Sequence, residues 1–135
     1  MHYDKSKENF GCDECWTTSA EDAWEAKAQF KREDPLIHES HFLIVILTCT
    51  KCTQRLILVF TEEIDWVDGE DPQYSTLMPL TQQEALDLNH LEDSLLEPEL
   101  NSLAPNRRSL RCDFPKGVEK PNLYWASGIS IGRHD

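Results

Sequence analysis

Four of the five cysteines in this 135-residue chain form two Cys-x2-Cys pairs, and no other feature constrains the fold as strongly. Zinc takes four ligands in a tetrahedral array, and structural zinc sites are commonly built from cysteine alone or from cysteine and histidine. Two cysteines three positions apart on a tight turn present both sulfurs to one ion, and a second such turn completes the tetrahedron. The pattern therefore predicts one structural Zn²⁺ ion, bound by Cys12, Cys15, Cys49 and Cys52.

Two other interpretations of these cysteines remain open. A redox-active Cys-x2-Cys motif precedes a helix in thioredoxin-like proteins, and it needs only one pair. The cysteines can also be free thiols, because Trp16 and Thr53 stand where a glycine often follows the second cysteine of a zinc knuckle. In the zinc interpretation four closed thiolates leave no position for water, so the metal holds the fold and catalyses nothing. Cys112 is expected to be a small core residue.

The segments on either side of the second cysteine pair are predicted to be strands. Residues 41–50 and 54–62 are rich in β-branched and aromatic residues, which favours a β-hairpin with the metal knuckle at its tip. Both segments are almost continuously apolar, which is typical of strands covered on both faces, so we expect them in the middle of a sheet. Residues 1–18 form an N-terminal arm with little apolar surface of its own. A bound ion would link this arm to the tip of the hairpin 41–62.

The remaining elements complete an α+β pattern. A cap at Thr18 or Ser19 opens a helix to about Lys31, and a capping box at Thr81 and Glu84 opens a second helix that ends before Pro98. Further strands are expected at 74–80, 107–112 and 123–131. The sequence predicts one domain over residues 1–135, with an antiparallel or mixed sheet and about two helices.

Charge is distributed unevenly along the chain. The formal net charge is −12, and residues 56–106 hold no Lys or Arg but twelve acidic residues. Such a field repels nucleic acid and anionic lipid and attracts basic surfaces. No apolar run approaches the ~20 residues that span a membrane, and residues 1–8 lack the apolar core of a secretory signal. We therefore expect a cytoplasmic protein that does not insert into membranes.

An acidic loop at residues 65–72 is the candidate partner-binding surface. In many protein interfaces an aromatic side chain is the buried anchor and charged residues surround it, and this loop has aromatic side chains beside carboxylates. A solvated turn, a divalent-cation site and a catalytic carboxylate pair are the alternatives, although the loop does not match the EF-hand ligand pattern. The predicted partner-binding residues are Asp65, Trp66, Asp68, Glu70, Asp71 and Tyr74.

Residues 49–54, 60–73 and 79–81 resemble a pattern in small uncharacterised bacterial proteins with a zinc-ribbon-like Cys-x2-Cys arrangement, a resemblance that implies no activity. In size, acidity and expected compartment the chain is also similar to immunity proteins of bacterial toxin systems, including contact-dependent growth inhibition. That resemblance is one of general character. It implies a protein that neutralises a toxin, often a basic nuclease, by covering its active site or docking beside it.

The leading hypothesis is thus a non-enzymatic binding protein with a structural zinc ion and an acidic face for a basic partner, such as a cognate toxin. One alternative is a zinc-ribbon protein that binds nucleic acid or acts as a regulator. Its basic patch would comprise Lys51, Arg55, Arg107, Arg108 and Arg111, and the overall charge argues against it. The other alternative is a small enzyme that uses the carboxylates of the acidic loop.

Overall fold

The two apolar segments around the second cysteine pair form the central hairpin of a sheet. Strand β3 (Phe42–Thr48) pairs antiparallel with β4 (Arg55–Glu62), from Phe42 opposite Thr61 to Thr48 opposite Arg55. The computed structural model describes residues 10–134, so the first nine residues of the predicted arm lie outside the described residues. The loop between β3 and β4 carries Cys49 and Cys52, as the sequence predicts.

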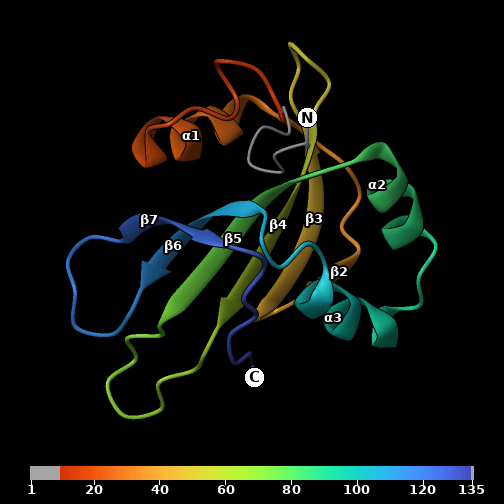
Figure 1. The fold of residues 1–135 in the computed structure, drawn as a ribbon. Helices are drawn as coiled ribbons and strands as arrows, with labels where there is room; N and C mark the ends of the chain where they lie inside the picture. The colour runs from red at the N-terminus through yellow and green to blue at the C-terminus, as the bar shows by residue number, and fades with distance from the viewer. Residues whose placement is uncertain (1–9, 135) are drawn as a thin grey trace.

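The sheet continues as a meander on the far side of β4. Strands β5 (Gln73–Leu80), β6 (Arg108–Phe114) and β7 (Asn122–Ser127) follow in order, and each pairs antiparallel with its neighbour. The other edge of β3 is shared by two short strands, β1 (Lys31–Arg32) and β2 (Ile37–Glu39), which the sequence analysis did not anticipate. The predicted α+β class with an antiparallel sheet is confirmed (Figure 1).

Helices cover both faces of this sheet. Helix α1 (Ala20–Ala26), followed by the 3₁₀ turn η2 (Lys27–Gln29), packs with Val45, Leu47 and Leu56 on one face. Helices α2 (Gln82–Asn89) and α3 (Asp93–Ser102) lie on the other face, over a core that includes Ile44 and Ile57. Figure 1 shows α1 on one side of the strands and α2 and α3 on the other. Strands β3 and β4 are therefore covered on both faces along part of their length, which explains their unbroken apolar sequence.

Two predicted helix ends are wrong. The first helix ends at Ala26 instead of about Lys31, because Lys31 and Arg32 pair with Leu47 and Thr48 as strand β1. The second predicted helix is two helices, and Pro98 lies inside α3 instead of after it. Proline has no N–H for the preceding turn, which disfavours this position. Burial of Leu96 and Leu100 in the core outweighs that local cost.

Two predicted strands also have different bounds. The predicted strand 107–112 begins and ends later, as β6. The predicted strand 123–131 stops at Ser127, where the chain leaves β6 and reaches Gly128, whose φ of +68° breaks the extended conformation. The residues after it still contribute to the core, because Ile129 is buried against the α2 and α3 side.

The predicted capping box of α2 is confirmed, and it also fixes the chain before β6. The Thr81 hydroxyl accepts the N–H of Glu84 (3.1 Å), and the Glu84 carboxylate accepts the N–H of Thr81 (2.8 Å). The same carboxylate binds the Arg107 guanidinium through two hydrogen bonds of 2.7 and 3.1 Å. Burial raises the pKa of Glu84, but these donors lower it more, so the net pKa lies below its ordinary value of 4.5.

We predict that Glu84→Gln lowers the free energy of unfolding at pH 7 by about 1–2 kcal/mol, because Arg107 loses its charged partner. A carboxyl whose pKa is lowered on folding stabilises the protein above its unfolded pKa, and this stabilisation is lost as pH falls through the folded pKa. The variant should therefore lose less stability than the wild type below pH 4.5. Urea unfolding at several pH values measures both effects. Glu99→Gln, at an exposed site on α3, is the control; an identical pH profile in all three proteins would contradict the prediction.

Candidate metal centre

The two cysteine pairs lie on loops with the same backbone turn. In the first loop the N–H of Trp16 donates to the carbonyl of Cys12 (3.1 Å), and in the second the N–H of Thr53 donates to the carbonyl of Cys49 (3.0 Å). The Cys49 N–H also donates to the Gln54 carbonyl (2.9 Å), which closes the end of the β3–β4 hairpin. Each turn brings two thiols to the same side of its loop.

The structure brings all four predicted ligand cysteines together. Every Sγ atom lies within 4.8 Å of the other three, and no histidine or carboxylate of the described chain joins the cluster. The Sγ atoms of Cys12 and Cys49 are 3.9 Å apart, and those of Cys15 and Cys52 are 3.7 Å apart. A tetrahedron with metal–sulfur bonds of about 2.3 Å has edges of about 3.8 Å, so these spacings suit one four-coordinate ion. The four cysteines are therefore positioned to hold a metal ion.

Burial and backbone donors set the charge state of these thiols. The Cys12 sulfur accepts the N–H groups of Glu14 and Cys15, which lower the pKa of Cys12 to about 7. Burial raises the pKa of Cys15 and of Cys52. Four thiolates this close together repel one another in a partly desolvated site, and a bound cation removes that repulsion. A cation bound among the four sulfurs would therefore favour their ionised form.

Two residues next to the cysteines adopt left-handed backbone conformations. Gly11 has a φ of +72°, and a Cβ atom there would lie 2.7 Å from both the Cys15 sulfur and the Trp16 Cβ. Only glycine fits at this position. Thr53 has a φ of +65° at the place where zinc knuckles often have glycine, and its hydroxyl donates to the Cys52 carbonyl. The second turn therefore forms without glycine, although threonine is strained there.

Gln54 is the residue at this centre that the sequence analysis missed. Its side-chain oxygen accepts the N–H of Gly11 (2.8 Å), and its amide nitrogen donates to the carbonyls of Arg55 (2.8 Å) and Leu80 (2.7 Å). One side chain thus links the first cysteine loop to β4 and β5. No sequence motif marks this role, although a polar residue directly after the second turn is the place to look for it.

The described part of the arm has a further anchor that the sequence analysis did not expect. The Trp16 and Trp125 rings meet edge to face with centroids 5.1 Å apart, and the Trp125 indole N–H donates to the Thr18 carbonyl (3.0 Å). The Arg108 guanidinium lies over both rings, 4.9 and 3.9 Å from their centroids. The expectation of an arm with little apolar surface is therefore wrong for residues 10–18, and the cysteine cluster is one of several features that position this part of the chain.

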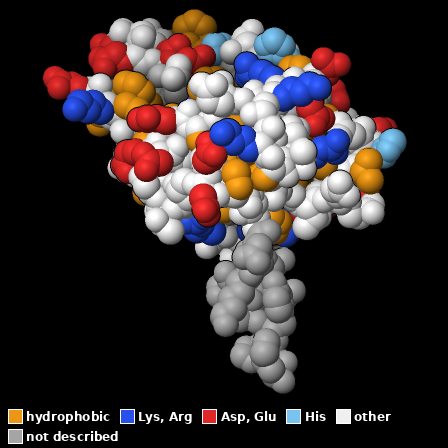
Figure 2. All heavy atoms as spheres, turned by 90° about the horizontal axis from the view of Figure 1, so that it is seen from above, with side chains coloured by type: hydrophobic (Ala, Val, Ile, Leu, Met, Phe, Trp, Pro, Cys, Tyr) orange, Lys and Arg blue, Asp and Glu red, His pale blue; other side chains and the backbone are white. Residues whose placement is uncertain are grey.

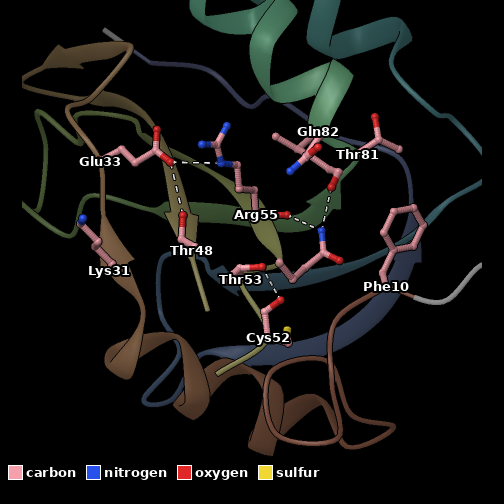
Figure 3. A pocket seen from close by; sticks show the side chains of 11 residues that line it. Phe10, Lys31, Glu33, Thr48, Cys52, Thr53, Arg55, Thr81 and Gln82 are labelled. Carbon is pink, nitrogen blue, oxygen red and sulfur yellow. Dashed lines mark hydrogen bonds and ion pairs between the residues drawn. The ribbon is translucent and has the colours of Figure 1, made fainter. Parts of the chain in front are cut away.

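A polar groove of about 660 Å³ lies beside the centre (Figure 3). Cys52 and Thr53 contribute to one wall, and the start of α2 contributes to another. Glu33 also lines the groove, and its carboxylate accepts the Thr48 hydroxyl (3.3 Å) and pairs with Arg55 (3.5 Å). The charged groups of this groove are thus largely satisfied by one another.

The acidic loop lies at the opposite end of β4 from the cysteines (Figure 1). The Asp65 carboxylate accepts the N–H groups of Val67, Asp68 and Glu70 at 3.1–3.3 Å, and Asp71 accepts the N–H of Asp65 (2.7 Å). Lys116, from the β6–β7 turn, binds Asp65 (3.0 Å) and Asp68 (2.7 Å). Lys116 and the three N–H donors lower the pKa of Asp65 to about 2. Asp65 and Asp71 therefore organise the loop itself.

The remaining predicted partner-binding residues differ in exposure. Trp66 and its neighbour Val67 are each 86% exposed, and Asp68 and Glu70 are exposed beside them. Tyr74 is half-buried at the start of β5. The structure thus presents an apolar tip, Trp66 and Val67, on a loop that its own hydrogen bonds hold in shape.

Folding brings basic residues from outside 56–106 onto several of its carboxylates. Glu84 pairs with Arg107, Glu63 with Arg133, and Asp65 and Asp68 with Lys116. On the face shown in Figure 2, acidic and basic side chains are interspersed. Several carboxylates of residues 56–106 are therefore paired in the fold. The exposed acidic residues of this segment that form no ion pair within residues 10–134 are Glu70 on the acidic loop and, on α2, α3 and their connection, Asp87, Glu92, Asp93 and Glu99.

The five residues considered for a basic patch are engaged within the described chain. Lys51 pairs with Glu14 (3.2 Å), while Arg55 and Arg107 pair with carboxylates already described. Arg108 lies on the two tryptophan rings, and Arg111 donates to the carbonyls of Ser127 and Gly128. These contacts leave few free cations there for phosphate groups, which weakens the nucleic-acid alternative.

Comparison with known proteins identified no relative of this chain. The chain matches no protein-family model, no curated protein and no solved structure. Over residues 10–134, none of the helices has the length and apolar character needed to cross a membrane.

We predict that Gln54→Ala weakens metal binding by about tenfold, the low end of the loss seen when groups that orient metal ligands are removed. The first cysteine loop then loses its hydrogen-bonded link to β4 and β5. Competition with a chromophoric chelator measures the affinity, and amide hydrogen exchange over residues 11–16 should become faster. Gln83→Ala, at an exposed site on α2, is the matched control. Unchanged affinity and exchange would show that the cysteines and Trp16 hold this loop without Gln54.

Proposed function

We propose that this chain is a non-enzymatic protein-binding module in which Zn²⁺ is a structural ion and the Trp66 loop is the binding surface. The zinc part of the proposal rests on the donor set. Four sulfur ligands in tetrahedral spacing select zinc or iron among the common metals, and zinc is the usual ion of closed four-cysteine structural sites. Because no position remains open for a substrate, the ion contributes to folding and not to a reaction.

We predict that the purified protein contains one Zn²⁺ per chain, and that Cys49→Ser removes it. Cys112→Ala is the matched control, because Cys112 is also buried but does not belong to the cluster. Removal of zinc by a chelator should lower the melting temperature of the wild type and of Cys112→Ala, while Cys49→Ser should start at the lower value. Elemental analysis and thermal unfolding measure these outcomes. Equal zinc content in Cys49→Ser and the wild type would contradict the assignment.

The binding part of the proposal rests on one observation: Trp66 is 86% exposed on a loop tied by Asp65 and Lys116. Trp66 and Val67 are adjacent and are the most exposed of the large apolar side chains within residues 10–134, and tryptophan is enriched among the residues that dominate interface energies. A loop already held in shape loses less conformational entropy on binding. Asp68 and Glu70 beside the tip favour a basic partner.

The most concrete form of this function is a bacterial immunity protein in the cytoplasm that neutralises a basic toxin, such as a nuclease. Three features support this proposal: a net charge of −12, the apolar tip with its carboxylates, and the small size of the chain. An immunity protein needs a fold that presents one rigid surface, and the antiparallel sheet with helices packed on it supplies such a support.

We predict that a basic protein encoded by a flanking gene binds this chain, and that Trp66→Ala weakens the complex by at least about 2 kcal/mol, as loss of an interface hot spot does. Asp68→Asn with Glu70→Gln should mainly slow association and reduce its salt dependence. Surface plasmon resonance at two salt concentrations measures both effects. Leu86→Ala, another exposed apolar site, is the control.

Two results would contradict this proposal. If neither flanking gene product binds at low salt, the immunity form is wrong. If a flanking product binds but Trp66→Ala leaves its dissociation constant unchanged, the Trp66 loop is not the interface. Because Trp66 is exposed, its replacement should leave the melting temperature unchanged, and so a loss of binding cannot be attributed to unfolding.

A further inference from the structure

Helix α1 covers only one end of its face of the sheet. Beneath the helix Val45, Leu47 and Leu56 are buried, but farther along the same face Leu43, Leu58 and Phe60 are only half-buried. Residues of the same two strands that point to the opposite face, such as Ile57 and Val59, are fully buried under α2 and α3. In Figure 1 the strands extend past α1 toward the acidic loop. Part of the central sheet is thus apolar and uncovered.

This uncovered part forms a cavity of about 390 Å³, which we call the sheet groove. Its floor is mostly apolar: Leu43, Leu58 and Phe60 come from β3 and β4, Cys112 and Phe114 come from β6, and the small polar Ser75 of β5 lies between them. Phe114 is 37% exposed, so the apolar floor reaches the surface. A volume in this range is typical of small-ligand sites, whereas a protein interface buries about 800 Å² on each partner. The size of the groove favours a small molecule.

Two cations stand at one end of the sheet groove. The Lys27 ammonium lies 3.9 Å from the centroid of the Trp24 ring, and Arg32 lines the groove next to it. Burial is the main cause that lowers the pKa of Lys27; Cys112 opposes this shift and the charge of Arg32 adds to it, so an anion at this end would favour the charged form of Lys27. Five basic side chains of residues 10–134 pair with carboxylates, but Lys27 and Arg32 form no ion pair within that range.

The opposite end of the sheet groove carries negative charge. Gln73 lines that end and donates to the Glu62 carboxylate (2.8 Å), which also pairs with His41 (2.9 Å). An anionic group in the groove is therefore attracted to Lys27 and Arg32 and repelled from Glu62. The two ends of the sheet groove therefore carry opposite charges. The end near α1 is cationic, the far end is acidic, and the floor between them is mostly apolar.

We propose that the sheet groove binds a free single-chain amphiphile with one carboxylate, a molecule of the fatty-acid class, with its head group between Lys27 and Arg32 and its chain on Leu58 and Phe60. The two cations supply charged hydrogen-bond donors for the carboxylate, and the floor removes the chain from water. This site involves neither the cysteine cluster nor the Trp66 loop, so it stands independently of the proposed function.

The test uses the zinc-loaded full chain and dodecanoate below its micelle concentration. We expect saturable one-to-one binding, seen by NMR as shifts of the Trp24 indole N–H and of the Leu58 and Phe60 amides. The Trp66 indole N–H should not move, and Trp24→Phe assigns the Trp24 signal. Lys27→Gln with Arg32→Gln should weaken binding by at least about tenfold, because two charged hydrogen-bond donors are lost.

Lys31→Gln with Arg133→Gln is the matched control, because it removes the same charge from sites outside the groove and should leave the affinity unchanged. Dodecyltrimethylammonium, with the same chain and the opposite charge, should bind at least about tenfold more weakly.

Four results would overturn the proposal: no saturable shift, equal loss of affinity in both double variants, equal affinity for the cationic amphiphile, or binding only to phosphatidylglycerol vesicles and not to free dodecanoate. An unchanged melting temperature of the Lys27 and Arg32 variant confirms that it is folded.

Discussion

The cluster of four sulfurs at the tip of the β3–β4 hairpin is the constraint on which the organisation of this protein depends. It joins the first loop of the described chain to the centre of the sheet across 33 intervening residues that form α1, η2, β1, β2 and β3. A metal ion held by both cysteine pairs would link two points far apart in sequence. Because such a site forms only on folding, the binding free energy of the ion would add to the stability of the fold. Gln54 and Trp125 support the same part of the chain from two further directions.

The elements that could be predicted from the sequence are those whose signal is local. The two cysteine pairs, the apolar strands beside the second pair and the capping box at Thr81 each depend on residues within a few positions of one another. The elements that could not be predicted depend on distant partners. Lys31 and Arg32 form a strand only because β3 offers an open edge, and Pro98 stays in a helix only because Leu96 and Leu100 are buried on either side of it. Gln54 carries no motif, because its three partners come from three separate segments.

The same distinction applies to charge. The run of twelve acidic residues between 56 and 106 suggests one continuous acidic surface, but a linear count cannot show where Lys116, Arg107 and Arg133 lie after folding. In the structure these cations neutralise carboxylates at the acidic loop and at the start of α2. The exposed feature that remains at the loop is apolar: Trp66 and Val67, with Glu70 nearby. A partner would therefore meet a hydrophobic tip with charged residues around it. Exposed acidic residues that form no ion pair within residues 10–134 remain on α1 as well as on α2 and α3.

Lys116 gives the tip one further property. It comes from the turn between β6 and β7, yet it holds Asp65 and Asp68 of the loop between β4 and β5. The surface around Trp66 is thus a discontinuous epitope, assembled from two hairpin ends that are separated by two helices in the sequence. A synthetic peptide that spans residues 62–73 lacks the lysine that keeps its carboxylates turned inward. Transfer of this surface to another scaffold would require both turns, held at the separation that strands β4 to β7 impose.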